Sequence, residues 1–155
     1  MVDFRNLANQ KLAEVERPKP LPRGEYIGRI KGVPEWKDSN FKQEDGSPEA
    51  KLVFVYELME PTDSVDRDEL EEAGGLKLGN GNFKTVTHEF NTAQGKLPFA
   101  LRRFIEGFGA DSNLSFAEAL EEISGQPVIV TIDHQPDKND PENVYTRVKK
   151  AIANV

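Results

Sequence analysis

The chain of 155 residues contains no cysteine, two histidines and one tryptophan. The absence of cysteine excludes disulfides, thiolate metal sites and cysteine nucleophiles, and it fits a reducing cytoplasm. No apolar run approaches the roughly 18 residues that a membrane span needs, and the first residues, MVDFRNLANQ, do not read as a signal peptide. We therefore expect a soluble, cytoplasmic protein that contacts no membrane.

Catalytic and metal-binding motifs are also missing. His88 and His134 occur in no HExxH pattern, and the chain has no GxSxG motif. The turn DHQPDKNDPE (133–142) gathers acids that could bind a hard cation, but it lacks the spacing and central glycine of an EF-hand loop. The segment GLKLGNGNF (75–83) matches neither a Walker A loop nor GxGxxG. We expect a protein that is not an enzyme and that holds no metal ion or cofactor.

The net charge of −7 is concentrated in one segment. Residues 57–72 contain eight acidic residues and one arginine, which is a net charge of −7, so the other 139 residues are neutral. A neutral body can still carry a basic surface. We interpret 57–73 as an acidic insertion, a solvated excursion between two strands that is ordered at most in one helical turn at RDELEEAGG.

Alternation and turn signals predict five strands and two helices. The clearest strand is KLVFVYEL (51–58), which alternates Leu52, Phe54, Tyr56 and Leu58 with more polar positions. The helix at 115–125 begins with a Ser115–Glu118 capping box. The other expected strands are 24–33, 83–90, 126–134 and 144–151, and the other helix is 96–109. Residues 34–50 are expected to form a long hairpin loop, with Trp36 near its base.

This order, with two helices before the fourth strand, is typical of a mainly β protein with a five-stranded OB-like barrel. A small β-sandwich and an α+β roll are the alternatives. Glycines 28 and 32 in the first strand predict a bulge or sharp coiling. The prolines of RPKPLPR (17–23) end any preceding helix, so we divide the chain into an N-terminal arm (1–22) and an OB-like domain (23–155). Residues 3–16 of the arm are expected to form a short docking helix or a partly ordered segment.

Basic and aromatic residues recur on the predicted outer strand faces and in the first loop. Proteins that bind single strands combine cations along the phosphates with aromatic rings on which bases stack. The alternative for the charged residues is an ordinary solvated sheet face, and for Trp36 a plug over the barrel. The candidate nucleic-acid-binding residues are Arg29, Lys31, Trp36, Lys37, Phe41, Lys42, Lys51, Tyr145, Arg147 and Lys149.

The runs LPRGEYIGRIKGV, KLVFVYEL, LPFALRRFIEGFG and FAEALEEISGQPVIVTI, together with the basic first loop, resemble bacteriophage OB-fold single-stranded DNA-binding proteins of the replication-accessory kind. The resemblance implies non-sequence-specific coating of single-stranded DNA in phage replication or recombination, in the host cytoplasm if the chain is phage-encoded. Such proteins often end in an acidic tail that recruits partners, whereas this chain ends RVKKAIANV, so segment 57–73 is the candidate for contacting replication or recombination proteins. A non-enzymatic adaptor or virion module that binds another protein is the alternative, and a homo-oligomer is compatible with either.

Overall fold

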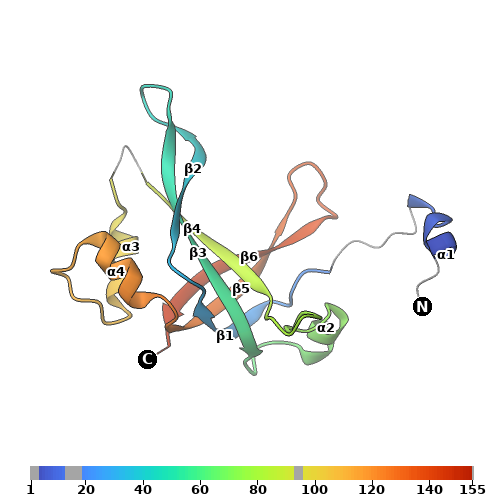
Figure 1. The fold of residues 1–155 in the computed structure, drawn as a ribbon. Coiled ribbons are helices and arrows are strands. Elements are labelled where there is room, and N and C mark those ends of the chain that lie inside the picture. Colours follow the sequence, from blue (N-terminus) through green and yellow to red (C-terminus); the bar gives the residue numbers. More distant parts are fainter. Residues whose placement is uncertain (1–3, 13–18, 93–95, 155) are drawn as a thin grey trace.

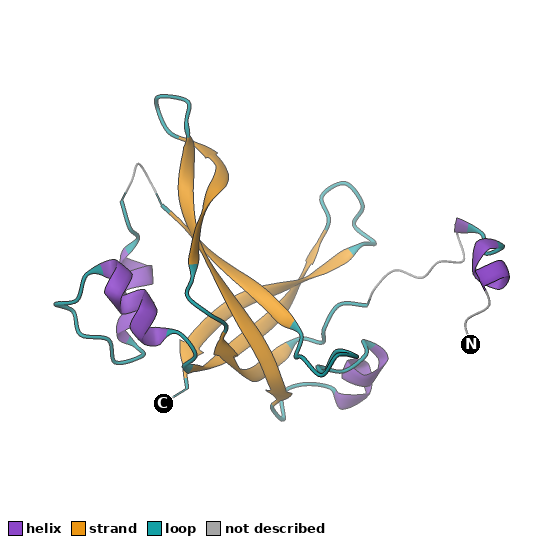
Figure 2. Ribbon diagram, in the orientation of Figure 1, coloured by secondary structure: helices purple, strands orange, loops and turns teal. Residues whose placement is uncertain are grey.

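A computed structural model describes residues 4–12, 19–92 and 96–154. These residues form one antiparallel sheet of six strands with four short helices around it (Figure 2). The elements are α1 (Phe4–Ala8), β1 (Gly24–Ile30), β2 (Glu35–Lys42), β3 (Pro48–Pro61), α2 (Arg67–Glu72), β4 (Thr85–Asn91), α3 (Phe99–Glu106), α4 (Phe116–Ile123), β5 (Pro127–Pro136) and β6 (Val144–Ala153).

The long strand β3 organises the sheet. One of its edges pairs with β2 and then with β1, and its other edge pairs with β4. The sheet continues from β1 to β5 and from β5 to β6. No ladder joins β4 to β6 among the described strands, so the sheet is open. The prediction of a mainly β fold is therefore confirmed, whereas the sheet has six strands instead of five and no closed barrel is observed.

The core lies on one face of this curved sheet. Leu52, Phe54, Tyr56 and Leu58 of β3 are all fully buried, as their alternation predicts. Their partners on neighbouring strands and on the helices complete the core, among them Tyr26, Ile30, Val128, Val130, Leu101, Ile105, Leu120 and Ile123. α3 and α4 each contribute one buried face to the core, and they lie side by side at one end of the sheet (Figure 1).

A bulge bends the sheet where β1 crosses β3. The β1–β3 register shifts between Ile27 and Gly28, which confirms the predicted irregularity. A Cβ atom on Gly28 would lie 2.1 Å from the carbonyl oxygen of Glu57. Only glycine permits this close approach of two backbones, so the residue fixes where the sheet bends.

The predicted loop at 34–50 is wrong, because most of it is strand. β2 and the first half of β3 form a hairpin that projects from the body (Figure 1). Only Ser39 of the eight residues in β2 is buried. Backbone ladder bonds need no apolar side chains, so an exposed edge strand of polar sequence gives no alternation signal.

The acidic segment 57–73 is not solvated throughout as we expected, although the helical turn predicted at RDELEEAGG is present as α2. Residues 57–61 continue β3. Asp66 is the N-cap of α2, and its side chain accepts hydrogen bonds from the backbone N–H groups of Asp68 and Glu69. Val65 and Leu70 are 5% and 7% exposed and belong to the core. Two apolar residues anchor the segment, so only its outer side is solvated.

The N-terminal residues divide into two parts. α1 lies apart from the sheet (Figure 1), and residues 13–16 of the predicted N-terminal helix lie outside the described part of the chain. Leu21, by contrast, is buried, and its backbone N–H donates to Thr146 Oγ1 at 3.0 Å. None of the helices in the described residues is both long and apolar enough to cross a bilayer.

Candidate nucleic-acid interface

Nine of the ten predicted residues occupy three places in the structure. The outer face of β2 and β3 is the face opposite the core. Three lysines lie on or beside it, and we name this group the lysine face: Lys31, Lys37 and Lys51. Trp36, Phe41 and Lys42 lie along the β2–β3 hairpin. Tyr145, Arg147 and Lys149 are exposed on β6, which the ladder order separates from β3 by β1 and β5. Arg29 lies between these groups on β1.

Trp36 does not share the face of the neighbouring lysine. It pairs in register with the buried Leu52, whereas Lys37 pairs with Lys51 on the outer face. The indole ring packs against the ring of Phe116 at the start of α4, and the two ring centroids are 5.9 Å apart. The Trp36 side chain is nevertheless 47% exposed. It therefore contacts the body on one side and offers part of its ring to solvent.

A shallow groove of about 400 Å³ crosses the lysine face. Val53 and Val55 line it together with Lys31 and Lys37. The backbone N–H of Lys31 donates to the Val55 carbonyl at 2.7 Å, which fixes the chain at the groove. Neither lysine forms an ion pair with any residue in the described ranges. Both ammonium groups can therefore neutralise charges of a ligand.

Two other cations of the outer face already have acidic partners. Arg29 lies 3.3 Å from Glu57, and Lys51 lies 2.9 Å from Glu89. Glu35 also lines the groove. The outer face is thus mixed in charge, and its unneutralised positive charge lies at the two groove lysines.

The hairpin end carries an exposed aromatic residue. Phe41 is 61% exposed, and Lys42 beside it is also exposed. The Ser39 hydroxyl accepts from the Phe41 backbone N–H at 3.1 Å, where the β2–β3 register is irregular. A ring held outward on a projecting hairpin is a surface on which a flat ligand can stack.

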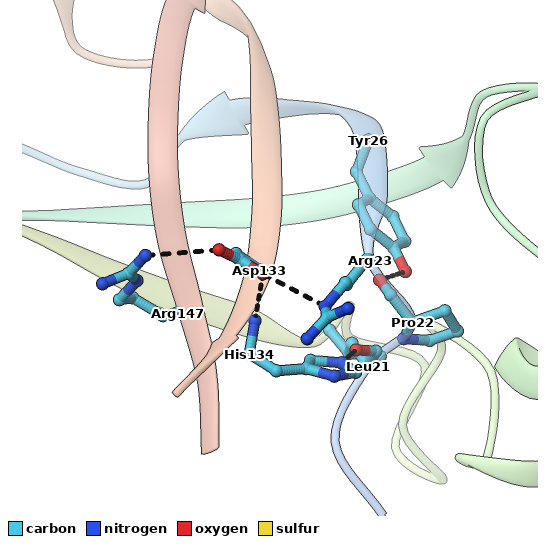
Figure 3. A network of polar contacts seen from close by, with 7 residues as sticks. All are labelled: Leu21, Pro22, Arg23, Tyr26, Asp133, His134 and Arg147. Carbon is cyan, nitrogen blue, oxygen red and sulfur yellow. Dashed lines mark hydrogen bonds and ion pairs between the residues drawn. The ribbon is translucent and has the colours of Figure 1, made fainter. Parts of the chain in front are cut away.

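The β6 group is ordered by acidic neighbours. The Tyr145 hydroxyl donates to Asp137 at 2.9 Å and accepts from Asn143 at 2.9 Å, and the Asp137 hydrogen bond raises the pKa of the tyrosine. Arg147 lies 3.3 Å from Asp133 (Figure 3). The acidic partners hold these side chains in place while leaving them exposed.

Sequence reasoning missed two cations of this region. Arg23 lies 3.1 Å from the same Asp133 carboxylate that contacts Arg147, so one acid orients two guanidinium groups (Figure 3). Lys150 is exposed beside Lys149 because the β5–β6 register shifts between Thr131 and Ile132. The interrupted alternation in VKKA is the sequence signal for this bulge, whereas nothing in the sequence pairs Arg23 with Asp133.

The segment before β1 is held against β5 by polar contacts. His134 Nε2 lies 2.6 Å from the Leu21 carbonyl oxygen, and the Tyr26 hydroxyl donates to the Pro22 carbonyl at 2.7 Å (Figure 3). Burial raises the pKa of Tyr26 to about 12, so the hydroxyl keeps its proton. These contacts place Arg23 beside Asp133.

The other histidine, His88, is half-buried among aromatic rings. His88 Nδ1 lies 2.8 Å from the Tyr56 hydroxyl, and its ring lies near Phe90 and Phe104. Burial lowers the pKa of His88 to about 4 and raises the pKa of Tyr56. The neutral imidazole and the Tyr56 hydroxyl therefore share a hydrogen bond at the edge of the core, and the tyrosine keeps its proton. The described residues contain no cluster of three or more His, Asp or Glu side chains suited to a metal ion.

Neither a protein-family model nor any curated protein matches this sequence.

Proposed function

We propose that this protein binds single-stranded DNA without sequence specificity, as a non-enzymatic coating protein in phage replication or recombination. The observation that carries the proposal is the groove of the lysine face. Lys31 and Lys37, which have no acidic partner in the described residues, flank an aliphatic floor of Val53 and Val55. Two free cations beside an apolar floor suit a polymer with phosphates on one side and flat bases on the other.

The projecting hairpin supports the same ligand. Phe41 offers an exposed ring and Trp36 a half-exposed one, and stacking of a base on an aromatic residue contributes roughly 1–3 kcal/mol. Nothing in these groups is shaped to read one base, because they are lysines and rings. The β6 cations with Tyr145 would extend the path on a second part of the surface.

We also propose that the sheet is an opened OB-type arrangement. β1 pairs with both β3 and β5, as the first strand of an OB-fold does, and β2 would continue that strand after a break. The helices α3 and α4 stand before the fourth strand in this assignment. In OB-folds the face of the second and third strands and the first hairpin loop bind oligonucleotides, which here correspond to β3, β4 and the β2–β3 hairpin.

The test is a titration of fluorescein-labelled oligo(dT), followed by anisotropy at low salt and then over a salt series. Contacts to phosphates release counterions, so log K should fall with log[salt] by roughly 0.7 for each phosphate neutralised. A duplex of the same length should bind more weakly, because its bases cannot reach the rings. No binding at low salt with micromolar protein, or an affinity independent of salt, would reject the proposal and favour an adaptor that binds another protein.

A further inference from the structure

The α3–α4 pair carries an apolar groove that the proposed DNA surface does not use. Its volume is about 720 Å³, and it is lined by parts of α3, α4 and the loop that joins them. Leu97 and Phe99 on its wall are 46% and 66% exposed. Ile105, Phe116 and Ala119 also line it. Large apolar side chains left open around a concave surface mark an interaction site.

Two leucines of the N-terminal segment, by contrast, are exposed to solvent. Leu7 is 52% exposed in α1, and Leu12 shortly after it is 93% exposed. α1 stands clear of the sheet, at the far end of the molecule from α3 and α4 (Figure 1). The segment therefore leaves its leucines exposed in an isolated chain and lies far from the groove of its own chain.

The charges of the two surfaces are complementary. Residues 4–12 contain two basic residues and no acidic one. The groove is lined by Glu106 and Asp111 against the single base Arg102, which pairs with Glu106. A short apolar segment with basic residues suits an apolar groove with a small excess of acid, in the manner of a helix lying in a groove.

We infer that the α3–α4 groove receives residues 4–12 of a second copy of this chain. The two surfaces are different and lie at opposite ends, so the contact is head to tail and each copy can bind one neighbour at either end. Such contacts produce open chains of copies. Under the proposed function they would place successive copies along one DNA strand, but the contact itself needs no DNA.

The inference is tested by sedimentation velocity without DNA over a range of protein concentrations. The wild type should show a sedimentation coefficient that rises with concentration. A segment variant, Leu7→Glu with Leu12→Glu, and a groove variant, Leu97→Glu with Phe99→Glu, should each remain monomeric. Met59→Glu is the control, because Met59 is 39% exposed on β3 outside both surfaces, and it should associate as the wild type does. Circular dichroism confirms that each variant is folded.

Mixing the two variants gives the sharpest result. The segment variant keeps an intact groove and the groove variant keeps an intact segment, so the mixture should form one-to-one dimers that do not grow further. A monomeric wild type at every concentration would overturn the inference, as would variants that still associate or a mixture that stays monomeric. Both variants should bind an oligo(dT) that accommodates one copy as tightly as the wild type. If the variants lose association but still bind oligo(dT), both proposals are supported. If the wild type associates but does not bind oligo(dT), only the proposed function is rejected.

Discussion

Trp36 and Lys37 are adjacent in β2 but lie on opposite faces of the sheet, so the indole contacts Phe116 while the ammonium group lines the outer groove. Side chains of a strand alternate between its faces, and two neighbours cannot contact the same patch. A DNA strand that uses both residues must therefore pass around the hairpin. The indole is both a packing residue on one side and an exposed surface on the other.

Replacing Phe116 with alanine should expose the indole further. We expect the emission of Trp36 to shift to longer wavelength and the free energy of unfolding to fall by about 1–3 kcal/mol, because Phe116 is only partly buried. Urea unfolding followed by fluorescence measures both effects, since Trp36 is the single tryptophan. Phe99→Ala, at a phenylalanine that is 66% exposed, should leave the emission wavelength unchanged. An unshifted spectrum in Phe116→Ala would contradict the observed contact.

Replacing Lys37 with alanine should weaken oligo(dT) binding and reduce the slope of log K against log[salt] by roughly 0.7. The reason is that Lys37 has no acidic partner among the described residues, so its charge is available to a phosphate. Lys77→Ala is the matched control, because it changes the net charge equally at a lysine that contacts the ring of Phe83 outside the proposed surface. Equal loss of slope in both variants would show that only the total charge matters.

Deletion of residues 61–73 should unfold the protein, although their acidity alone suggests that they are dispensable. Leu70→Ala isolates the cause and should lower the free energy of unfolding by about 2–4 kcal/mol, since the side chain is 7% exposed in the core. Glu71→Gln on the exposed side of α2 is the control and should change stability by less than about 0.5 kcal/mol. If Leu70→Ala were as stable as the wild type in urea, Leu70 would not anchor the segment to the core.

Stability should fall as the pH drops from about 6.5 to about 4, in part because of His88. Its pKa is lowered to about 4 in the folded protein, so between these values the unfolded chain binds more protons and protonation favours unfolding. The contribution is fully present above pH 6.5 and amounts to about 1–3 kcal/mol. Urea midpoints measured at several pH values should show a shallower decline in His88→Gln, which removes this titration.

The remaining acid sensitivity in His88→Gln would come from carboxylates such as Asp133 and Asp137, whose pKa values are lowered chiefly by backbone hydrogen bonds. An identical decline in the variant and the wild type would contradict this, because it would show that the pKa of His88 is the same in the folded and the unfolded protein.

The sequence by itself determined the elements whose side chains alternate between water and the core. The buried face of β3, the capping box of α4 and the bulge at Gly28 could all be predicted, because period-two burial, cap hydrogen bonds and close backbone approach depend on residue type at a local spacing. Lys31 could be assigned to an exposed strand face for the same reason, whereas Lys37 was expected in a loop and lies in β2.

Only the tertiary structure decided which of these residues meet. β2 is held by ladder bonds to β3, which a polar sequence does not reveal, and this pairing separates Trp36 from Lys37. Val65 and Leu70 enter the core because α2 reaches it, although their neighbours are acidic. Arg23 and Arg147 share Asp133 across more than a hundred residues of chain. Contacts between distant segments depend on strand pairing and sheet curvature, and no local spacing encodes them.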